Sequence, residues 1–378
     1  NTGDKPAALS AVMPWSGLLQ VVRNWRDYNL GDTPLYSIGY MEDTRHLGEG
    51  QFQWHPLPNA RYSVDGHYRR PRHRHPMVIL RNEATGEHFI AQLAWSAGYT
   101  FEFDLDADCG TMDRSAYLAF RIGPDAPAPL RIIAPGETVK SPEVHMGLVF
   151  GGFDNTIHAM HDHIRRSVML PQARGRGGWV ESGIGPEEEL TPEVIIAQLD
   201  IAAELGAEVF FIDASWYTPP FGNWYDTCGD WEVDRKRFPD GLAPIRERAH
   251  QKGMLFGLWM DAERIGRQSK VYAEHSDWLS TAYDGKKRLG GGMLDISRPE
   301  VAKWMEEQIA KVIEENEIEF FRLDYNVGHI GRGGYVERDG YVENAYWRYY
   351  ENLYAIYERL RQRFPDVIFE SCSSGGAR

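Results

Sequence analysis

The first 150 residues contain short runs in which apolar and polar positions alternate. The run at 99–105 alternates at every position, as a strand with one solvated face does. Two further runs, at 76–81 and 88–93, flank a turn-like segment, and another follows at 118–122. Many short strands separated by Pro, Gly and Asp, with no helix of normal length, predict a β-sandwich for this part of the chain.

A different pattern begins near residue 154. Residues 154–169 predict one amphipathic helix, and a Gly-rich junction follows it. Helical patterns then alternate with apolar runs, and one helix is predicted to begin with a capping box at 297–300. The apolar runs lie at 179–181, 209–213, 254–259, 319–324 and 367–370. Continuous apolar strands separated by helices are typical of a parallel sheet covered on both faces.

These strands and helices form five β/α units. No Gly-x-Gly-x-x-Gly follows the first strand, which disfavours a dinucleotide-binding fold and favours a (β/α)8 TIM barrel. We therefore predict a multidomain β plus α/β protein. Its parts are a β-sandwich domain at 1–153, incomplete at its N-terminus, and a helical linker at 154–176. A catalytic barrel at 177–378 follows, truncated at its C-terminus, with about five units present.

The charge balance restricts the partners. The chain has 378 residues, with 41 Lys and Arg against 55 Asp and Glu, and a net charge of −14. Such a charge repels a polyanion, and no apolar run approaches the roughly 18 residues of a membrane span. We therefore expect neither a nucleic-acid nor a membrane partner. Three cysteines are too few for a disulfide framework or a Cys-based zinc site. No signal peptide is recognised, so a cytoplasmic and a secreted bacterial location both stay open.

Polar and aromatic residues gather where the predicted barrel strands end. In a barrel these ends meet at one mouth, where the chemistry takes place. The residues there are Asp213 and Trp216, then Trp259, Asp261 and Glu263, then Arg322, Asp324 and Asn326, then Glu370 and Cys372. Carboxylates and Arg hydrogen-bond hydroxyl groups, and Trp stacks on sugar rings. The set predicts a sugar site, and paired carboxylates are the machinery of glycoside hydrolysis.

Some of these carboxylates also have a structural interpretation. Asp213 can cap the segment that follows it, and Glu263 can pair with Arg264 or Arg267 as a surface charge. Asp324, flanked by polar residues on one strand, is the strongest catalytic candidate.

Other polar groups lie outside the strand ends. Asp295 precedes a predicted helix cap, which favours a structural role, whereas Asp230 and Asp234 lie on a long loop where both interpretations stay open. No third metal ligand accompanies the histidines of the predicted 154–169 helix, so a solvated surface is expected for His158, His161 and His163. The basic stretch 68–75 predicts a subunit contact or the rim of the barrel mouth rather than a phosphate track.

Ordered motifs run from about residue 175 to the end of the chain. They are 229–234 with 238–242, 253–263, 275–278, 294–301, 322–326 and 370–378. Together they resemble glycoside hydrolase family 36, the microbial α-galactosidases and α-N-acetylgalactosaminidases. The resemblance implies a retaining exo-α-glycosidase. Such an enzyme hydrolyses terminal α-linked galactose, or a galacto-configured derivative, from oligosaccharides or glycoconjugates through a covalent glycosyl-enzyme intermediate.

The resemblance also implies roles for individual residues. Asp324 stands at the place of the catalytic nucleophile, and the acid/base Asp belongs to the next strand, beyond Arg378. Together with the strand-end residues, the expected substrate-binding set is Asp213, Trp216, Trp259, Arg288, Arg322, Asn326, Cys372 and Gly375. No cofactor and no metal are implied. Carbohydrate is the expected partner, and a homo-oligomer, tetramer or dimer, is in keeping with the family.

The sequence departs from the family pattern at two positions. The family reads Asp-Asp-Gly-Trp where this chain has Asp213-Ala214-Ser215-Trp216, and it has a sugar-binding Lys at the place of Arg322. A planar guanidinium does not replace an ammonium at a hydrogen-bonding site. Both changes put the identity of the sugar in question, so α-N-acetylgalactosaminidase specificity with the same mechanism is one alternative. A non-catalytic sugar-binding relative is another.

Overall fold

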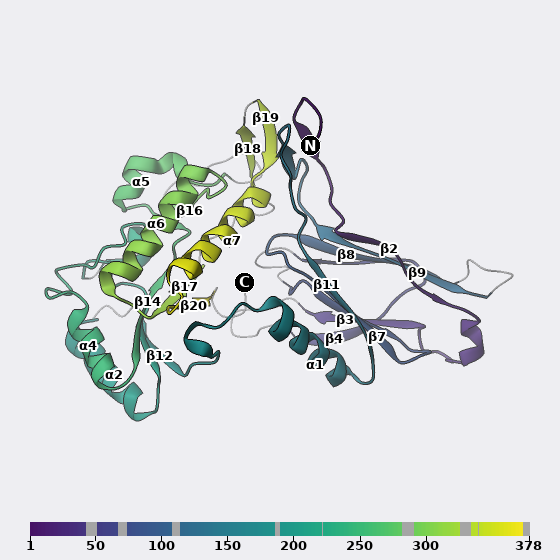
Figure 1. Ribbon diagram of the computed structural model, residues 1–378, viewed down its shortest axis with the longest axis horizontal. Helices are drawn as coiled ribbons and strands as arrows, with labels where there is room; N and C mark the ends of the chain where they lie inside the picture. The colour runs from purple at the N-terminus through teal and green to yellow at the C-terminus, as the bar shows by residue number, and fades with distance from the viewer. Residues whose placement is uncertain are drawn as a thin grey trace. The chain divides into compact units, whose positions relative to one another are not determined.

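The computed structural model describes residues 1–42, 51–66, 74–107, 114–185, 190–220, 222–281, 291–325, 334–338 and 340–372. The chain divides into two compact units (Figure 1). One contains Asn1–Leu170 and Val336–Asn344, and the other contains Pro171–Tyr335 and Ala345–Ser374.

Two antiparallel sheets make up most of the first unit. A five-stranded sheet has the order β11-β7-β6-β3-β4, and a four-stranded sheet has the order β2-β9-β8-β5. The strands are β2 (Trp15–Val22), β3 (Tyr36–Met41), β4 (Phe52–Pro56), β5 (Arg61–Gly66), β6 (Met77–Asn82), β7 (Glu87–Leu93), β8 (Tyr99–Asp106), β9 (Ala116–Pro124) and β11 (Val144–Phe150). A small third sheet pairs β1 (Ala7–Leu9) with β10 (Arg131–Ile133). The short strands predicted from the alternating pattern are therefore present.

The two larger sheets meet through aromatic side chains. Phe120 of β9 packs against Phe101 and Phe103 of the neighbouring β8. It also contacts Phe89 of β7, in the other sheet, with ring centroids 5.5 Å apart. All three β8 and β9 rings are buried. The alternation along 99–105 therefore reflects one face turned toward the other sheet.

Helix α1 (Phe153–His163) packs on the five-stranded sheet. Its Met160 contacts Ile79 of β6 and Ile90 of β7, with Phe153 and Ile157 beside them. The α-helix ends at His163 and continues as a π-helical turn, Ile164–Val168. One continuous helix over 154–169 was expected, whereas the last turn widens, with the Met169 amide bonded to the Ile164 carbonyl at 2.8 Å.

A five-stranded parallel sheet organises the second unit. Its order, β12-β13-β14-β17-β20, is the order along the chain. The strands are β12 (Glu181–Ile184), β13 (Val209–Ile212), β14 (Leu255–Met260), β17 (Phe320–Leu323) and β20 (Ile368–Ser371). The helices that connect them are α2 (Pro192–Glu204), α4 (Ala243–Gln251), α6 (Pro299–Asn316) and α7 (Tyr346–Arg363), with short α3 (Trp224–Thr227) and α5 (Lys270–His275). The predicted β/α alternation is thus observed, although the first strand begins at Glu181 rather than ending there.

The N-cap predicted from the sequence is observed at the start of α2, but the capping box predicted at the start of α6 is not. Thr191 accepts a hydrogen bond from the Val194 amide at the start of α2, as expected of an N-cap. The capping box predicted at 297–300 is wrong, because α6 has Arg298 as its N-cap residue without a side-chain bond. The Ser297 hydroxyl donates to Asp295 instead. In the described part of the chain, no helix is both long and apolar enough to cross a membrane.

A hairpin inside the barrel range belongs, from Val336 onward, to the first unit. It follows the catalytic-candidate strand β17 and consists of β18 (Tyr335–Arg338) and β19 (Tyr341–Asn344). The buried Glu343 carboxylate accepts the Ile132 amide of β10 at 2.8 Å. The Asn344 amide donates to the Pro129 carbonyl at 2.7 Å.

Candidate functional site

The carboxyl ends of the parallel strands bring the predicted residues together. Trp259 of β14 lies opposite Arg322 of β17 in the strand register, and Arg322 lies opposite Glu370 of β20. Asp213 directly follows β13, and Asp324 directly follows β17. One row of charged and aromatic side chains therefore crosses the sheet near its carboxyl edge.

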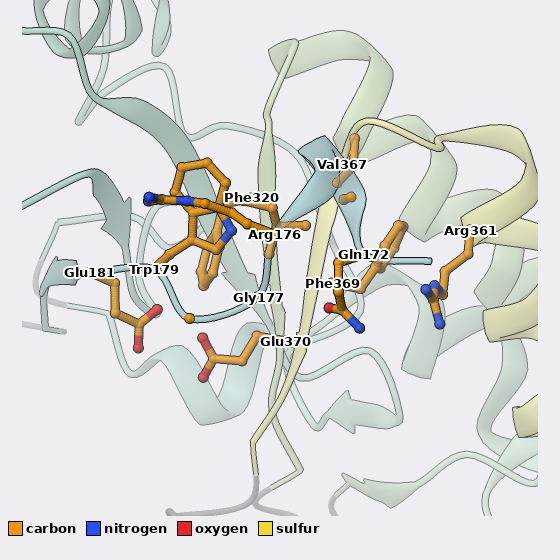
Figure 2. A pocket seen from close by; sticks show the side chains of 13 residues that line it. Gln172, Arg176, Gly177, Trp179, Glu181, Phe320, Arg361, Val367, Phe369 and Glu370 are labelled. Carbon is orange, nitrogen blue, oxygen red and sulfur yellow. The ribbon is translucent and has the colours of Figure 1, made fainter. Parts of the chain in front are cut away.

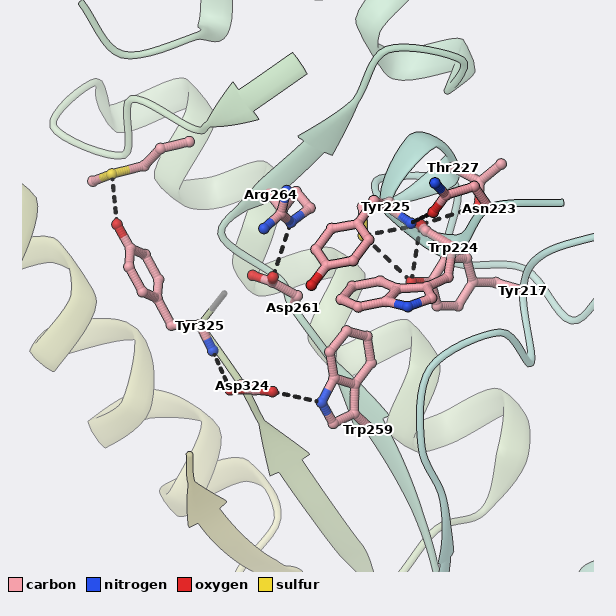
Figure 3. Close-up of polar contacts among 12 residues, drawn as sticks. Tyr217, Asn223, Trp224, Tyr225, Thr227, Trp259, Asp261, Arg264, Asp324 and Tyr325 are labelled. Atoms are coloured by element: carbon pink, nitrogen blue, oxygen red, sulfur yellow. Dashed lines mark hydrogen bonds and ion pairs between the residues drawn. The ribbon is translucent and has the colours of Figure 1, made fainter. Parts of the chain in front are cut away.

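The Asp324 carboxylate is buried and held in a fixed orientation (Figure 3). Its Oδ2 accepts the indole Nε1–H of Trp259 at 3.0 Å, and its Oδ1 accepts the Tyr325 amide at 2.7 Å. Tyr325 is itself anchored, because its hydroxyl donates to the Met293 sulfur at 2.9 Å. These two hydrogen bonds fix the direction in which both carboxylate oxygens of Asp324 point.

Asp213 is half-buried and lies close enough to Asp324 to interact with its charge. Burial raises the pKa of Asp213, and the negative charge of Asp324 raises it further. The Ala214 amide, which donates to Asp213 Oδ1 at 2.7 Å, and the Arg322 charge oppose this rise. The two carboxylates therefore share one electrostatic environment, as the strand-end pattern predicts.

Trp216 is predicted from the sequence to stack on a sugar ring, but it has no exposed ring surface. Its side chain is fully buried, and its Nε1–H donates to the Trp259 backbone carbonyl at 2.8 Å. Trp216 packs against Tyr217 and Trp231, so its ring is part of the core next to β14 and is not available to stack on a sugar. Trp259 is only 1 % exposed and acts as a donor to Asp324 rather than as a stacking platform.

Two aromatic residues that the sequence analysis missed cover Trp259 (Figure 3). Trp224 of α3 meets the Trp259 ring edge-on, with centroids 5.1 Å apart, and stacks on Tyr225 at 3.6 Å. The Arg264 guanidinium lies over the Tyr225 ring, 4.6 Å from its centroid. Tyr225 is 42 % exposed beside the buried carboxylates. Tyr225 lies on the short helix α3, rather than at a strand end, and four helical residues leave no periodic signal in the sequence.

Arg322 is bound by two carboxylates. Its Nη2 forms an ion pair with Glu181 of β12 and another with Glu370 of β20, the latter at 2.9 Å. Burial opposes the charge of Arg322, but its contacts with Glu370 and Glu181 raise the pKa of the guanidinium. Burial and a hydrogen bond to Glu370 raise the pKa of Glu181 to about 7, against the opposing charge of Arg322. Cys372 follows β20 near this cluster, and its amide donates to the Leu323 carbonyl at 2.7 Å.

A cavity of about 340 Å³ lies beside the Glu181 and Glu370 carboxylates (Figure 2). Its lining includes Glu181, Glu370, Trp179, Phe320 and Ile368. Phe320 and Ile368 lie two residues before Arg322 and Glu370 on their strands, so the cavity extends toward the amino-terminal end of the sheet. Asp324 is not among its lining residues.

The two residues that depart from the family pattern after β13, Ala214 and Ser215, differ in burial and in backbone conformation. Ala214 is fully buried in this structure. Ser215 has a φ of +82°, a left-handed conformation that glycine adopts without strain and serine does not. The chain therefore keeps the local backbone of a glycine position while carrying a Cβ there.

Other candidate carboxylates have structural partners. Glu263 is buried and accepts the Tyr349 hydroxyl, so the alternative interpretation of a surface charge paired with Arg264 or Arg267 is wrong. Arg264 pairs with the buried Asp261 at 3.0 Å.

The loop acids are also bound to their surroundings. Asp230 accepts the Lys270 amide at 2.9 Å, and Asp234 accepts the Arg237 amide at 2.8 Å. These contacts give both loop residues a structural function. Asp295, bonded to Ser297, has one as well.

Several predictions lie outside the described residues: Arg288, Asn326, Gly375, and 68–73 of the basic stretch. His158, His161 and His163 are all exposed, as expected, and the His163 ring nitrogen lies 3.0 Å from that of His145. Within the described ranges, no group of three or more His, Cys, Asp or Glu side chains is arranged to hold a metal ion.

Comparison with known proteins places this geometry in context. The Melibiase family model matches residues 138–378. α-Galactosidase Mel36A of Lactobacillus acidophilus is 28 % identical over 318 residues, which is 79 % of this chain and 40 % of that protein. The bifunctional α-galactosidase/sucrose kinase AgaSK of Mediterraneibacter gnavus is 27 % identical over 88 % of this chain and 35 % of its own length. This chain thus spans about 40 % or less of the length of these curated relatives.

A solved structure shares the fold. The crystal structure of the family 36 α-galactosidase AgaA from Geobacillus stearothermophilus matches with a TM-score of 0.78 at 22 % identity, covering 95 % of this chain and 49 % of that one. A variant of AgaA was crystallised with stachyose. The family model covers more than half of the chain, and the buried carboxylates lie at the strand ends where the motifs put them. The chain belongs to the melibiase family, of the glycoside hydrolase family 36 α-galactosidase type.

Proposed function

We propose that the whole protein is a retaining exo-α-glycosidase that releases terminal α-linked galactose, or a galacto-configured derivative, from oligosaccharides or glycoconjugates. The observation that carries this proposal is the Asp324 carboxylate, buried at a strand end and fixed by Trp259 Nε1 and the Tyr325 amide. Membership of the melibiase family and the stachyose bound by a variant of AgaA support carbohydrate as the substrate.

Asp324 acts as the nucleophile in this mechanism. Its ionised oxygen attacks the anomeric carbon while the glycosidic oxygen leaves with a proton from an acid, giving a glycosyl ester on Asp324. Water then attacks the same carbon and releases the sugar with retained configuration. The acid/base is the Asp that the family resemblance puts on the next strand.

The two domains have distinct architectures in this proposal. The two antiparallel sheets, joined through Phe89 and Phe120, form a β-sandwich. The parallel sheet supplies the first five strands of an eight-stranded barrel, because its spatial order follows the chain and each crossover contains a helix.

Asp324→Ala in the whole protein tests the mechanism. We expect kcat to fall by roughly three orders of magnitude or more with the fold intact, because the covalent step is lost. Added azide should partly restore turnover of an activated aryl α-galactoside and yield the β-glycosyl azide. Asp200→Asn is the control, since Asp200 forms an ion pair with Arg248 and lies outside the site. Near-native turnover by Asp324→Ala would refute the assignment.

α-N-Acetylgalactosaminidase activity is the second candidate, and the buried methyl of Ala214 favours it. A carboxylate that accepts a sugar hydroxyl contributes on the order of 1.5–3 kcal/mol, and Ala214 has none. We expect kcat/KM for the native protein to favour the N-acetylgalactosaminide over the plain α-galactoside, and Ala214→Asp with Arg322→Lys to shift this ratio toward galactose. A native preference for plain galactosides without a gain in the double variant would exclude this candidate. Sugar binding without turnover by the native protein would indicate the non-catalytic relative.

A further inference from the structure

Three neighbours hold the Arg322 guanidinium. Its Nη2 is shared by the carboxylates of Glu181 and Glu370. Its Cζ lies 4.0 Å from the centroid of the Phe211 ring. These neighbours come from β12, β20 and β13, whereas Arg322 comes from β17. Four strands of the sheet therefore converge on one side chain.

This arrangement fixes the plane of the guanidinium, and 15 % of the Arg322 side chain stays exposed. The Phe211 ring contacts one face of the Arg322 guanidinium, and the ion pairs with Glu181 and Glu370 fix the direction of its Nη2 edge. The Arg322 Nε–H is buried and has no hydrogen-bond partner among the residues that the structure describes. Because a guanidinium is rigid, fixing Nη2 also fixes the direction of its other N–H groups. Asp213 lies close enough to sense the Arg322 charge.

The two glutamates form a pair that needs a cation. Figure 2 shows the Glu181 and Glu370 carboxyl groups turned toward each other. Two ionised carboxylates that contact the same guanidinium nitrogen repel each other, and the Arg322 fork between them compensates for that repulsion. A lysine ammonium would neutralise charge as a point, but it cannot lie flat on Phe211 with two edges in defined directions. The surroundings of Arg322 thus suit a fork.

We propose that Glu181 and Glu370 are positioning residues for sugar recognition. They orient Arg322 so that its remaining N–H groups donate to one hydroxyl of the galacto-configured sugar beside Asp213. This inference rests on the proposed function and adds to it, because it assigns part of the hydroxyl specificity to residues that do not touch the sugar.

The test uses the whole protein with an aryl α-galactoside and the set of its monodeoxy analogues. Glu181→Gln and Glu370→Gln, assayed at about pH 8 where Glu181 is ionised, keep the side-chain shape and remove the charge. We expect each to lower kcat/KM for the parent galactoside by roughly tenfold or more, mainly through KM. For one deoxy analogue, the loss should shrink to about twofold or less, because the hydroxyl that Arg322 binds is absent. Arg322→Lys, which leaves the carboxylates with a cation, should single out the same analogue.

Glu306→Gln is the matched control. Glu306 of α6 pairs with Arg359 of α7 at 2.6 Å, outside the strand-end row, so its loss should leave every kcat/KM unchanged. Equal losses on all analogues, or no loss, in the Glu181 and Glu370 variants of an active enzyme would overturn the inference and leave the proposed function standing. A native protein that cleaves no α-galactoside or α-N-acetylgalactosaminide would overturn both.

Discussion

The buried faces of the two kinds of sheet differ in composition along their strands. On β8 of the first unit, every second residue from Tyr99 to Leu105 is apolar and buried. On β17 of the second unit, the same alternation begins with Phe320 and continues with Arg322 and Asp324. The buried face of β8 is apolar from end to end, whereas the corresponding face of β17 becomes charged at its carboxyl end.

Neighbouring parallel strands repeat this change. Phe211 is followed two residues later by Asp213, and Ile368 is followed by Glu370. A buried charge costs several kcal/mol unless it is paired, so such a row persists only where its members compensate one another. Buried positions on β8 therefore contribute to stability alone, whereas the carboxyl-end positions of the second unit combine stability with chemistry.

The largest effect on stability is expected at the contact between the antiparallel sheets. Phe120 is 2 % exposed and packs against rings from both sheets. Phe120→Ala should lower the free energy of unfolding of the first unit by about 3–5 kcal/mol, because it leaves a cavity. Urea denaturation measures this loss. The kcat of the folded fraction should stay unchanged, and a proportionate fall in kcat would contradict the separation of roles between the two units.

Removing the indole donor at Asp324 should affect chemistry more than stability. Trp259→Phe deletes the 3.0 Å bond to Oδ2 while keeping an aromatic ring. A hydrogen bond to a charged group contributes about 1.5–3 kcal/mol, so kcat should fall by roughly 10- to 150-fold. Steady-state kinetics on an aryl α-galactoside measures the change.

Trp231→Phe provides the matched control for the lost ring volume. Trp231 is 2 % exposed in the same aromatic cluster, and its Nε1 has no hydrogen-bond partner in the described part of the chain. This variant should destabilise the protein about as much as Trp259→Phe while kcat stays near native. Equal losses of kcat in both variants would mean that packing, and not the bond to Asp324, governs turnover.

The Glu181–Glu370 carboxylate pair predicts a pH dependence of the free energy of unfolding. The pKa of Glu181 rises from 4.5 to about 7 in the folded protein, through burial and the Glu370 hydrogen bond. The native state therefore binds more protons than the unfolded state between these values. The contribution of Glu181 to the free energy of unfolding is full below about pH 4.5 and is lost as the pH rises through about 7. Urea unfolding of native protein and Glu181→Gln at about pH 5 and about pH 8 should show a smaller decline in the variant, and equal declines would exclude Glu181 as the source.

The smallest effect is expected at Ser215. Its φ of +82° carries strain that Ser215→Gly relieves, partly offset by the larger chain entropy of glycine in the unfolded state. We expect a gain of about 0.5–1 kcal/mol in the free energy of unfolding, measured by thermal or urea denaturation. Ser215→Ala keeps the Cβ and should give no gain. An equal gain from both substitutions would point to the hydroxyl group as the source.

Strand ends were predictable because a buried strand leaves a clear mark in the sequence. Asp213 and Asp324 each follow an apolar run, and the structure brings them into one electrostatic environment. Glu181 was missed because its importance depends on the register and curvature of strands far apart in the chain. The predicted first strand ended where β12 begins.

Burial of aromatic rings was also beyond sequence reasoning. Trp216 and Trp224 both follow β13, but only the fold decides that Trp216 lies beneath β14 while Trp224 covers Trp259. Polar contacts between near neighbours caused a similar failure at Ser297. Its hydroxyl binds the Asp295 side chain, two residues before it, and not the helix that follows.

The β18–β19 hairpin limits how the two units can be exchanged or expressed separately. The chain leaves the second unit after β17, contributes Val336–Asn344 to the first unit, and returns for α7. A single cut near Leu170 would therefore separate the Glu343 carboxylate from the Ile132 amide that it binds. Modular recombination with related enzymes would have to carry residues 336–344 with the N-terminal cassette, so the natural crossover points lie on both sides of the hairpin as well as at the linker.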